Sequence, residues 1–182
     1  MSTFNEKTLA KVIKEGGKRG VEIQGVAEMG GLEFFCTKLD EPEGNVDLLV
    51  ESMKAMNAES DPSEEERRGG SGSVGKMIFS INNEKVAVVA YVPKEMTEKI
   101  DIKEWIEAAI TPFDGKVLSV NGDIATAEIL ADAEKDRFTL KMRDEALPLA
   151  IAYLRSKGLF PEADSDSDSD VAFGDDFDFD GC

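Results

Sequence analysis

Histidine is absent from this 182-residue sequence, and cysteine is scarce. Without histidine the chain cannot build a Ser-His-Asp triad, a Cys-His dyad, a His-containing zinc site or a histidine proton shuttle. The two cysteines, Cys36 and Cys182, lie far apart, so they do not form the dense cysteine framework of a small secreted domain. This cysteine usage favours a reducing compartment. We expect the cytoplasm, with the nucleus as the alternative.

Long apolar runs are also missing. No stretch of 18 consecutive apolar residues occurs, so no membrane-spanning helix is expected. The first residues, MSTFNEKTLAKV, have neither the apolar core of a signal peptide nor the arginine-rich, acid-poor character of a transit peptide. We therefore expect no membrane partner.

Basic residues are outnumbered by acidic ones. The chain has 21 Lys and Arg against 38 Asp and Glu, which gives a net charge of −17. Nine acidic groups and no basic one lie in residues 162–182, so residues 1–161 retain −8 of the −17. Affinity for nucleic acid comes largely from Lys and Arg that neutralise phosphates. The composition therefore argues against a generic phosphate-binding surface and leaves room for a local basic face.

Residues 162–182, EADSDSDSDVAFGDDFDFDGC, read as a disordered acidic tail behind a domain of residues 1–161. Their like charges repel, and their apolar residues are too few to offset the entropy cost of ordering the backbone. Aromatic side chains among carboxylates suit a basic protein, with charge setting the on-rate and aromatics the residence time. The candidate partner-binding residues are Phe173, Asp175, Asp176, Phe177, Asp178 and Phe179.

Hydrophobic periodicity predicts an α+β domain. We expect a mixed or antiparallel sheet that is built from hairpins and packed by three to four helices. Helices are predicted over residues 5–15, 46–56, 102–110 and 144–157, with Asn45 and Asp101 as N-caps. Hairpins are predicted for residues 75–92 and 116–130, the first with a central, doubly covered strand. Further strands are expected over residues 21–26, 32–39 and 138–142, and a flexible internal linker over residues 58–73.

Two motifs superficially suggest a ligand and fail the required pattern. The glycine-rich piece RRGGSGSVGK lacks the phosphate-loop signature and precedes a strand, not a helix. The aspartate repeat from Asp164 has serine where a calcium loop needs its sixth-position glycine. The sequence therefore predicts no cofactor, no metal site and no catalytic residue.

The order of elements over residues 33–116 resembles the C-terminal domain of alanyl-tRNA synthetases. The segments that carry the resemblance are LEFFCTKLD, NVDLLVESMKAM, GKMIFSINNEKVAVVAYVPKEM, KIDIKEWIEAAI and FDGK. In the family a strand, a helix, a hairpin and a second helix lead into a glycine-rich segment. Here VLSVNGDIATAEI takes the place of the glycine run and the Arg/Lys-Pro-Asp segment that follow in the family.

The resemblance implies a non-catalytic, translation-associated binding protein whose partner is tRNA, a synthetase or a ribosome-linked component. The alternative is an acidic chaperone or adaptor that binds basic proteins through the tail. An enzyme with carboxylate or metal chemistry is a third interpretation, for which the sequence selects no residues. The candidate RNA-facing residues are Lys76, Lys94, Lys99, Lys103 and Lys116.

Overall fold

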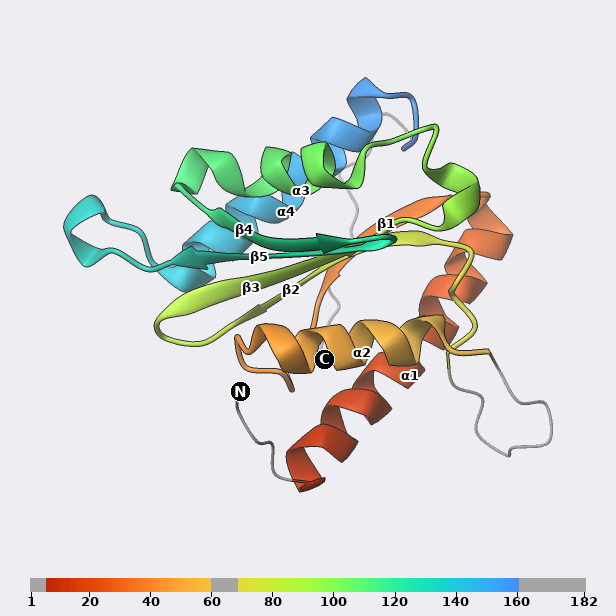
Figure 1. Cartoon of the computed structure of the whole chain (residues 1–182), viewed down its shortest axis with the longest axis horizontal. Helices are drawn as coiled ribbons and strands as arrows, with labels where there is room; N and C mark the ends of the chain where they lie inside the picture. Colours follow the sequence, from red (N-terminus) through yellow and green to blue (C-terminus); the bar gives the residue numbers. More distant parts are fainter. Residues whose placement is uncertain (1–5, 60–68, 161–182) are drawn as a thin grey trace.

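The computed structural model describes residues 6–59 and 69–160, which form a five-stranded sheet between two helical layers (Figure 1). The strands are β1 (Phe34–Lys38), β2 (Gly75–Ile81), β3 (Lys85–Tyr91), β4 (Lys116–Asn121) and β5 (Ile124–Leu130). The α-helices are α1 (Glu6–Gly30), α2 (Val46–Asn57), α3 (Ile102–Ile110) and α4 (Thr139–Ser156). The predicted α+β class is confirmed. None of the helices in the described part combines the length and apolar character needed to cross a bilayer.

The sheet is mixed, with the strand order β1-β2-β3-β5-β4. β1 runs parallel to β2, and the other neighbouring pairs are antiparallel. The two predicted hairpins are confirmed as β2–β3 and β4–β5. β3 lies at the centre and is buried over most of its length, as its nearly all-apolar sequence predicts.

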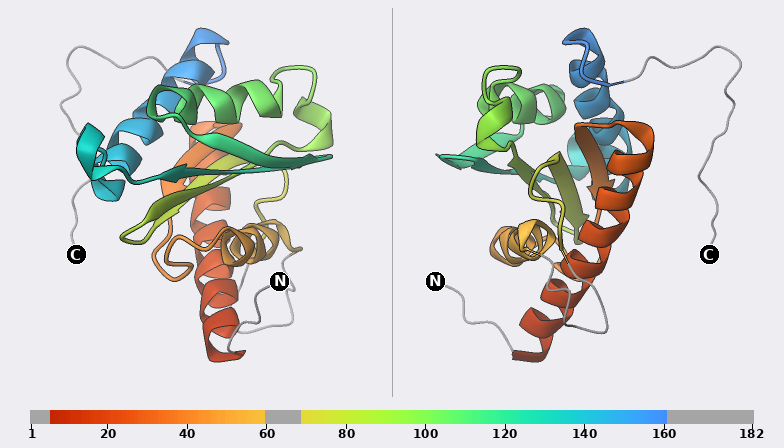
Figure 2. Two further views of the ribbon diagram at one scale, coloured as in Figure 1. Left: turned by 60° about the vertical axis from the view of Figure 1, so that its left-hand side comes forward. Right: turned by 90° about the vertical axis from the view of Figure 1, so that its right-hand side faces the viewer.

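Alternate residues of β3 point to opposite faces of the sheet and so enter two cores. Val88 belongs to the core under α3 and α4, together with Trp105. Val89 belongs to the core under α2, together with Leu49. The Trp105 indole nitrogen donates to the carbonyl of Ala150 at 3.1 Å, which ties α3 to α4. Figure 2 shows α3 and α4 on one face of the sheet and α2 on the other.

Both predicted N-caps are confirmed. The Asn45 side-chain oxygen accepts from the backbone N–H of Leu48 at 3.1 Å. Asp101 accepts from the N–H groups of Lys103 and Glu104. Each cap satisfies N–H groups that have no partner within the helix, so these two helix starts are set by local sequence.

The N-terminal 25 residues of the described chain form a single helix, α1 (Glu6–Gly30). The prediction that a helix ends near residue 15 and is followed by a strand over residues 21–26 is wrong. It treated Gly16 and Gly17 as a helix stop because glycine has low helix propensity. The helix instead continues through both.

The glycines of α1 are used for a close approach to α2. A Cβ atom on Gly16 would lie 2.3 Å from the carbonyl oxygen of Ser52, and one on Gly20 would lie 2.8 Å from that of Met56. The Ser52 hydroxyl donates to the carbonyl of Val12 at 3.0 Å in the same crossing. Only residues without a Cβ permit this distance between backbones, so packing against α2 outweighs the propensity cost.

Residues 138–142 are not a strand, because α4 begins at Thr139. Phe138 has extended backbone angles and occupies the N-cap position. The extended start and the β-favouring residues Phe138 and Thr139 explain the error, and the helix then packs Met142 into the core under α3 and α4.

The end of the predicted linker that the structure describes is packed against the domain. Gly69 and Ser71 are buried. The Ser71 hydroxyl donates to the carbonyl of Met56 at 2.8 Å, and the Gly69 N–H donates to the carbonyl of Gly17 at 2.8 Å. This part of residues 58–73 is therefore not an exposed linker, since it joins α1 to the C-terminal end of α2.

Candidate functional site

Three of the predicted RNA-facing lysines, Lys94, Lys99 and Lys103, are exposed along the segment that enters α3. They do not form a basic surface. Lys99 makes an ion pair with Glu33 at 2.7 Å. Five carboxylates share residues 94–107 with the three lysines: Glu95, Glu98, Asp101, Glu104 and Glu107. The segment is therefore net negative and offers no concentrated attraction to phosphates.

Lys116 is exposed but lies apart from those three lysines. It begins β4, after the C-terminal end of α3, whereas Lys103 lies in the first turn of that helix. The structure thus places these lysines at opposite ends of α3 and does not bring the predicted set together.

Lys76 is fully buried. Its ammonium nitrogen lies 2.5 Å from the Asn57 side-chain oxygen, 2.5 Å from the Ser71 carbonyl and 3.0 Å from the Val74 carbonyl. The same nitrogen lies 4.8 Å from the ring centroid of Tyr91. Burial lowers the pKa of Lys76 from 10.5 to about 7. The prediction that Lys76 faces RNA is wrong, because its charge is enclosed by the protein.

Lys76 and Tyr91 together hold the chain between residue 69 and β2. The ammonium group joins the Ser71 and Val74 carbonyls to the end of α2. The Tyr91 hydroxyl donates to the Gly72 carbonyl at 2.6 Å. Three acceptors match the three N–H donors of an ammonium group, so the buried lysine has a structural role in this corner of the fold.

A basic surface does occur on α1. Four exposed lysines follow one side of this helix at i, i+4, i+7 and i+11: Lys7, Lys11, Lys14 and Lys18. We call them the lysine face. At 100° per residue they fall within an arc of about 60°, and at 1.5 Å per residue they extend over about 16 Å. They lie opposite the buried residues Val12, Gly16 and Ile23.

The acidic side chain of Glu15, beside the middle of this face, is engaged by backbone N–H groups. Glu15 accepts from the backbone N–H groups of Asp40 and Glu41, both at 3.1 Å. Burial raises the pKa of Glu15, although the two backbone hydrogen bonds oppose the shift. Glu15 and Glu41 border, with Lys11, Lys14 and Lys18, a hollow of about 370 Å³. The lysine face is thus the most concentrated basic feature of α1.

The sequence prediction missed the lysine face because it ended the helix before Lys18. The spacing of Lys7, Lys11, Lys14 and Lys18 was the signal that could have revealed it, since lysines at i, i+4, i+7 and i+11 share one side of any continuous helix. Because Gly16 and Gly17 were taken as the end of the helix, Lys18 was not assigned to the same helix as the other three lysines.

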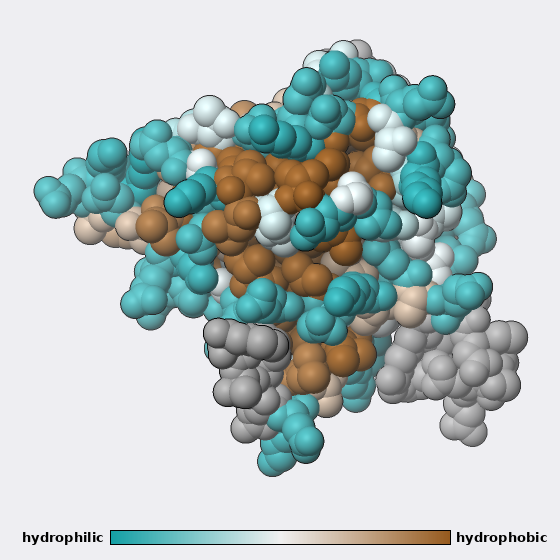
Figure 3. Space-filling view, viewed as in Figure 1, coloured by the Kyte–Doolittle hydropathy of each residue, from teal (hydrophilic) through white to brown (hydrophobic). Residues whose placement is uncertain are grey.

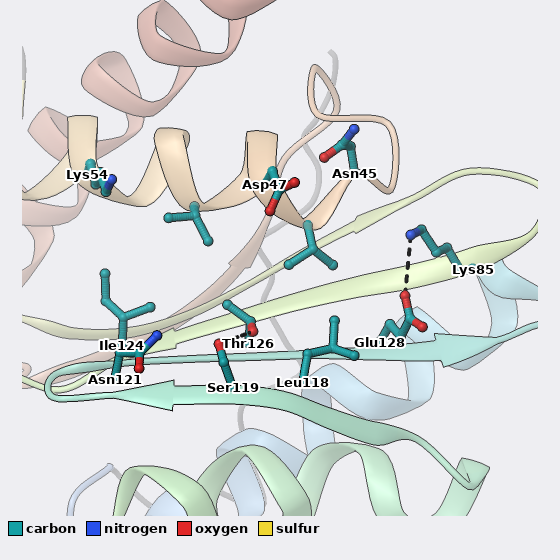
Figure 4. A pocket seen from close by; sticks show the side chains of 12 residues that line it. Asn45, Asp47, Lys54, Lys85, Leu118, Ser119, Asn121, Ile124, Thr126 and Glu128 are labelled. Carbon is teal, nitrogen blue, oxygen red and sulfur yellow. Dashed lines mark hydrogen bonds and ion pairs between the residues drawn. The ribbon is translucent and has the colours of Figure 1, made fainter. Parts of the chain in front are cut away.

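A second feature is a groove between α2 and the sheet, which we call the α2–β4 groove (Figure 4). Its volume is about 670 Å³. Apolar side chains line it from both sides: Val46 and Val50 from α2, and Leu118 and Ile124 from β4 and β5. Lys85 pairs with Glu128 at 3.3 Å at one end. The hydroxyls of Ser119 and Thr126 are hydrogen-bonded at 2.7 Å on its floor.

The described residues offer neither a reactive thiol nor a cluster of metal ligands. Cys36 is partly buried, and burial raises the pKa of its thiol, which disfavours the reactive thiolate. Among residues 6–59 and 69–160 no group of three or more Cys, Asp or Glu is placed to hold a metal ion. The predicted partner-binding residues of the tail lie outside the described residues: Phe173, Asp175, Asp176, Phe177, Asp178 and Phe179.

The described chain is thus an α+β domain with a lysine face on α1 and an apolar groove beside β4. No family model matches the chain, and no curated protein sequence matches it. Among solved structures, the chain is similar to the C-Ala domain of Aquifex aeolicus alanyl-tRNA synthetase. The match has 19% identity and a TM-score of 0.41, and it covers 68% of this chain and 88% of that chain.

A catalytic domain of the histidine kinase ThkA is also similar, with 17% identity and a TM-score of 0.21 over 71% of this chain and 96% of that chain. The first of these structures belongs to the same synthetase domain that the order of elements over residues 33–116 resembles. The match is a partial similarity of fold.

Proposed function

We propose that this protein is a non-catalytic binding protein that contacts RNA through the lysine face of α1, in the translation-associated setting that the sequence resemblance implies. The observation that carries the proposal is the run of four exposed lysines along one side of a helix, in a chain whose net charge is −17. Residues 6–19 hold five basic and two acidic groups, so their net charge of +3 is opposite in sign to that of the whole chain.

The spacing of the lysines suits a phosphate backbone. Their positions extend over about 16 Å, and a nucleic-acid strand carries one phosphate per about 3.4 Å of duplex axis. A lysine ammonium binds phosphate as a compact point charge without reading the base. The acidic surface elsewhere repels phosphates. RNA contact should therefore be confined to α1 and should depend on RNA backbone more than on sequence.

The proposal predicts how RNA affinity depends on salt. Four phosphate contacts give a slope of log K against log salt of roughly −3, since each contact contributes about −0.7 to −0.9. The triple variant Lys11→Gln, Lys14→Gln, Lys18→Gln should reduce the size of the slope by about 2. Filter binding of total tRNA between 50 and 200 mM salt measures the slope for the wild type and for the triple variant.

A variant with the same change of charge provides the control. Lys94→Gln, Lys103→Gln, Lys116→Gln removes three lysines that lie outside α1, and the slope should stay unchanged. If that variant loses the slope while the α1 variant keeps it, the RNA contacts lie near α3 instead. If the wild-type chain binds no tRNA at 50 mM salt, the protein does not bind RNA in this way.

A further inference from the structure

β4 is an edge strand with exposed apolar side chains in its middle. It is last in the strand order and pairs only with β5 among the described strands. Leu118 is 45% exposed and Val120 is 42% exposed. Proteins usually protect such an edge with charges, prolines or a covering segment, because its unpaired N–H and C=O groups accept another strand. Lys116 and Asn121 lie at the two ends of β4, and its pairing with β5 is irregular between Val117 and Ser119. Leu118 and Val120, in its middle, are neither charged nor proline.

Apolar surface extends from this edge into the neighbouring groove. Figure 3 shows an apolar patch over β4 that continues into the hollow between β4 and α2. Leu118 lies in both features, as an exposed residue of the edge and as part of the groove lining. A strand added to β4 would therefore place one row of its side chains against the mouth of the α2–β4 groove.

The chain contains a segment with the matching pattern. Residues 173–180 read FGDDFDFD. In an extended conformation successive side chains point to opposite sides. Phe173, Phe177 and Phe179 then share one side with a single aspartate, and the other side carries Asp176, Asp178 and Asp180 with Gly174. The segment would show one largely aromatic side and one acidic side, which is the pattern of a strand that covers an apolar surface.

The length of chain beyond the described domain permits this contact. The described residues end at Phe160, and 12 residues separate Phe160 from Phe173. A connection of that length spans up to about 40 Å. Phe160 lies beside Leu32 and Glu33, next to β1, at the edge of the sheet opposite β4. Four strand spacings of about 4.8 Å separate the two edges, roughly 19 Å, which a connection of that length can span. Eight residues extend over about 26 Å as a strand, enough to cover all of β4.

We propose that residues 173–180 of the same chain add to the free edge of β4 and place Phe177 and Phe179 at the α2–β4 groove. The charges lining the groove nearly balance, because Lys54 and Lys85 face Asp47 and Glu128. Backbone hydrogen bonds and the phenylalanines, more than the aspartates, carry this docking. The docking site is separate from the lysine face of α1, so this proposal does not depend on RNA binding.

Hydrogen exchange of the full-length protein tests the proposal. The β4 amides that point away from β5 should exchange at least 10-fold more slowly in the wild type than in Phe177→Ser, Phe179→Ser. A second variant exchanges two neighbours, Phe177→Asp with Asp178→Phe. It keeps composition and charge but breaks the alternation, so it should lose the same protection. Circular dichroism shows whether each variant keeps the fold.

Four results would overturn the proposal. Equal exchange of β4 in the wild type and in Phe177→Ser, Phe179→Ser would show that the segment does not cover this edge. Full protection in the exchanged variant would show that the alternation of phenylalanine and aspartate does not determine what covers this edge. Protection that disappears on tenfold dilution would identify a second copy of the chain as the occupant. Protection confined to α1 and lost in 500 mM salt would place the tail on the lysine face instead.

Discussion

Replacement of Gly16 by alanine should lower the free energy of unfolding by about 3 kcal/mol, because overpacking costs roughly 1–3 kcal/mol and a lost hydrogen bond about 1 more. The new Cβ would lie 2.3 Å from the Ser52 carbonyl oxygen, 2.9 Å from its carbonyl carbon and 2.9 Å from its Cα. All three are backbone atoms of α2, so no side chain can move aside. α1 has to shift away from α2, which also weakens the bond from Ser52 to the Val12 carbonyl.

Gly25→Ala in the same helix is the matched control. A Cβ on Gly25 meets nothing within 4 Å, so this change should stabilise the helix by about 0.5–1 kcal/mol. Thermal unfolding should show Gly16→Ala melting about 6–12 °C below the wild type and Gly25→Ala slightly above it, at about 2–4 °C per kcal/mol. Equal melting temperatures for the two variants would mean that α1 does not cross α2 at Gly16.

Elements that are fixed by local pattern could be predicted from the sequence. The all-apolar run of β3 indicated a central strand, and the Asn121-Gly122 pair indicated the β4–β5 turn, where Gly122 has φ 61°. Asn45 and Asp101 marked two helix starts, because their side chains act on N–H groups within three residues. In each case the deciding interaction is close in sequence, so the sequence pattern contains it.

The wrong prediction that α1 ends near residue 15 arose because the deciding interaction lies far away in sequence. Gly16 and Gly20 are placed in a helix by residues 36 positions later, Ser52 and Met56 of α2. Local propensity favours ending the helix at these glycines, and only the crossing reverses that preference. The same distance in sequence explains why the full lysine face was not recognised.

The candidate site was predicted less well than the fold for a related reason. Lys76 looked like other lysines in the sequence, and nothing near it indicated that Asn57 would accept its ammonium group 19 residues away. Exposure and pairing of a charged side chain depend on the finished fold. The other four predicted lysines, at residues 94–116, were correctly expected at the surface. The carboxylates between them, however, remove the basic character of that surface.

Lys76→Met should destabilise the protein strongly at high pH and much less at low pH. At pH 9 Lys76 is a neutral amine with two N–H donors. The variant removes both from the acceptors on Asn57, Ser71 and Val74, at a cost of about 3 kcal/mol. At pH 6 the wild type itself carries the cost of a buried charge, so the difference between the two proteins should be about 2 kcal/mol smaller.

The sign follows from the lowered pKa. In the folded state Lys76 loses its proton near pH 7, and in the unfolded state near 10.5. Between these values the unfolded chain binds more protons, so wild-type stability relative to Lys76→Met rises with pH, by up to about 1.4 kcal/mol per unit. Below about pH 7 the cost of the buried charge is fully present. Burial raises the pKa of Tyr91, which keeps its hydroxyl neutral across this range.

Urea unfolding of the wild type and of Lys76→Met at pH 6, 7.5 and 9 gives the difference in their free energies of unfolding directly. A difference that is constant with pH would show that Lys76 stays charged inside the protein, held by its three acceptors and the Tyr91 ring.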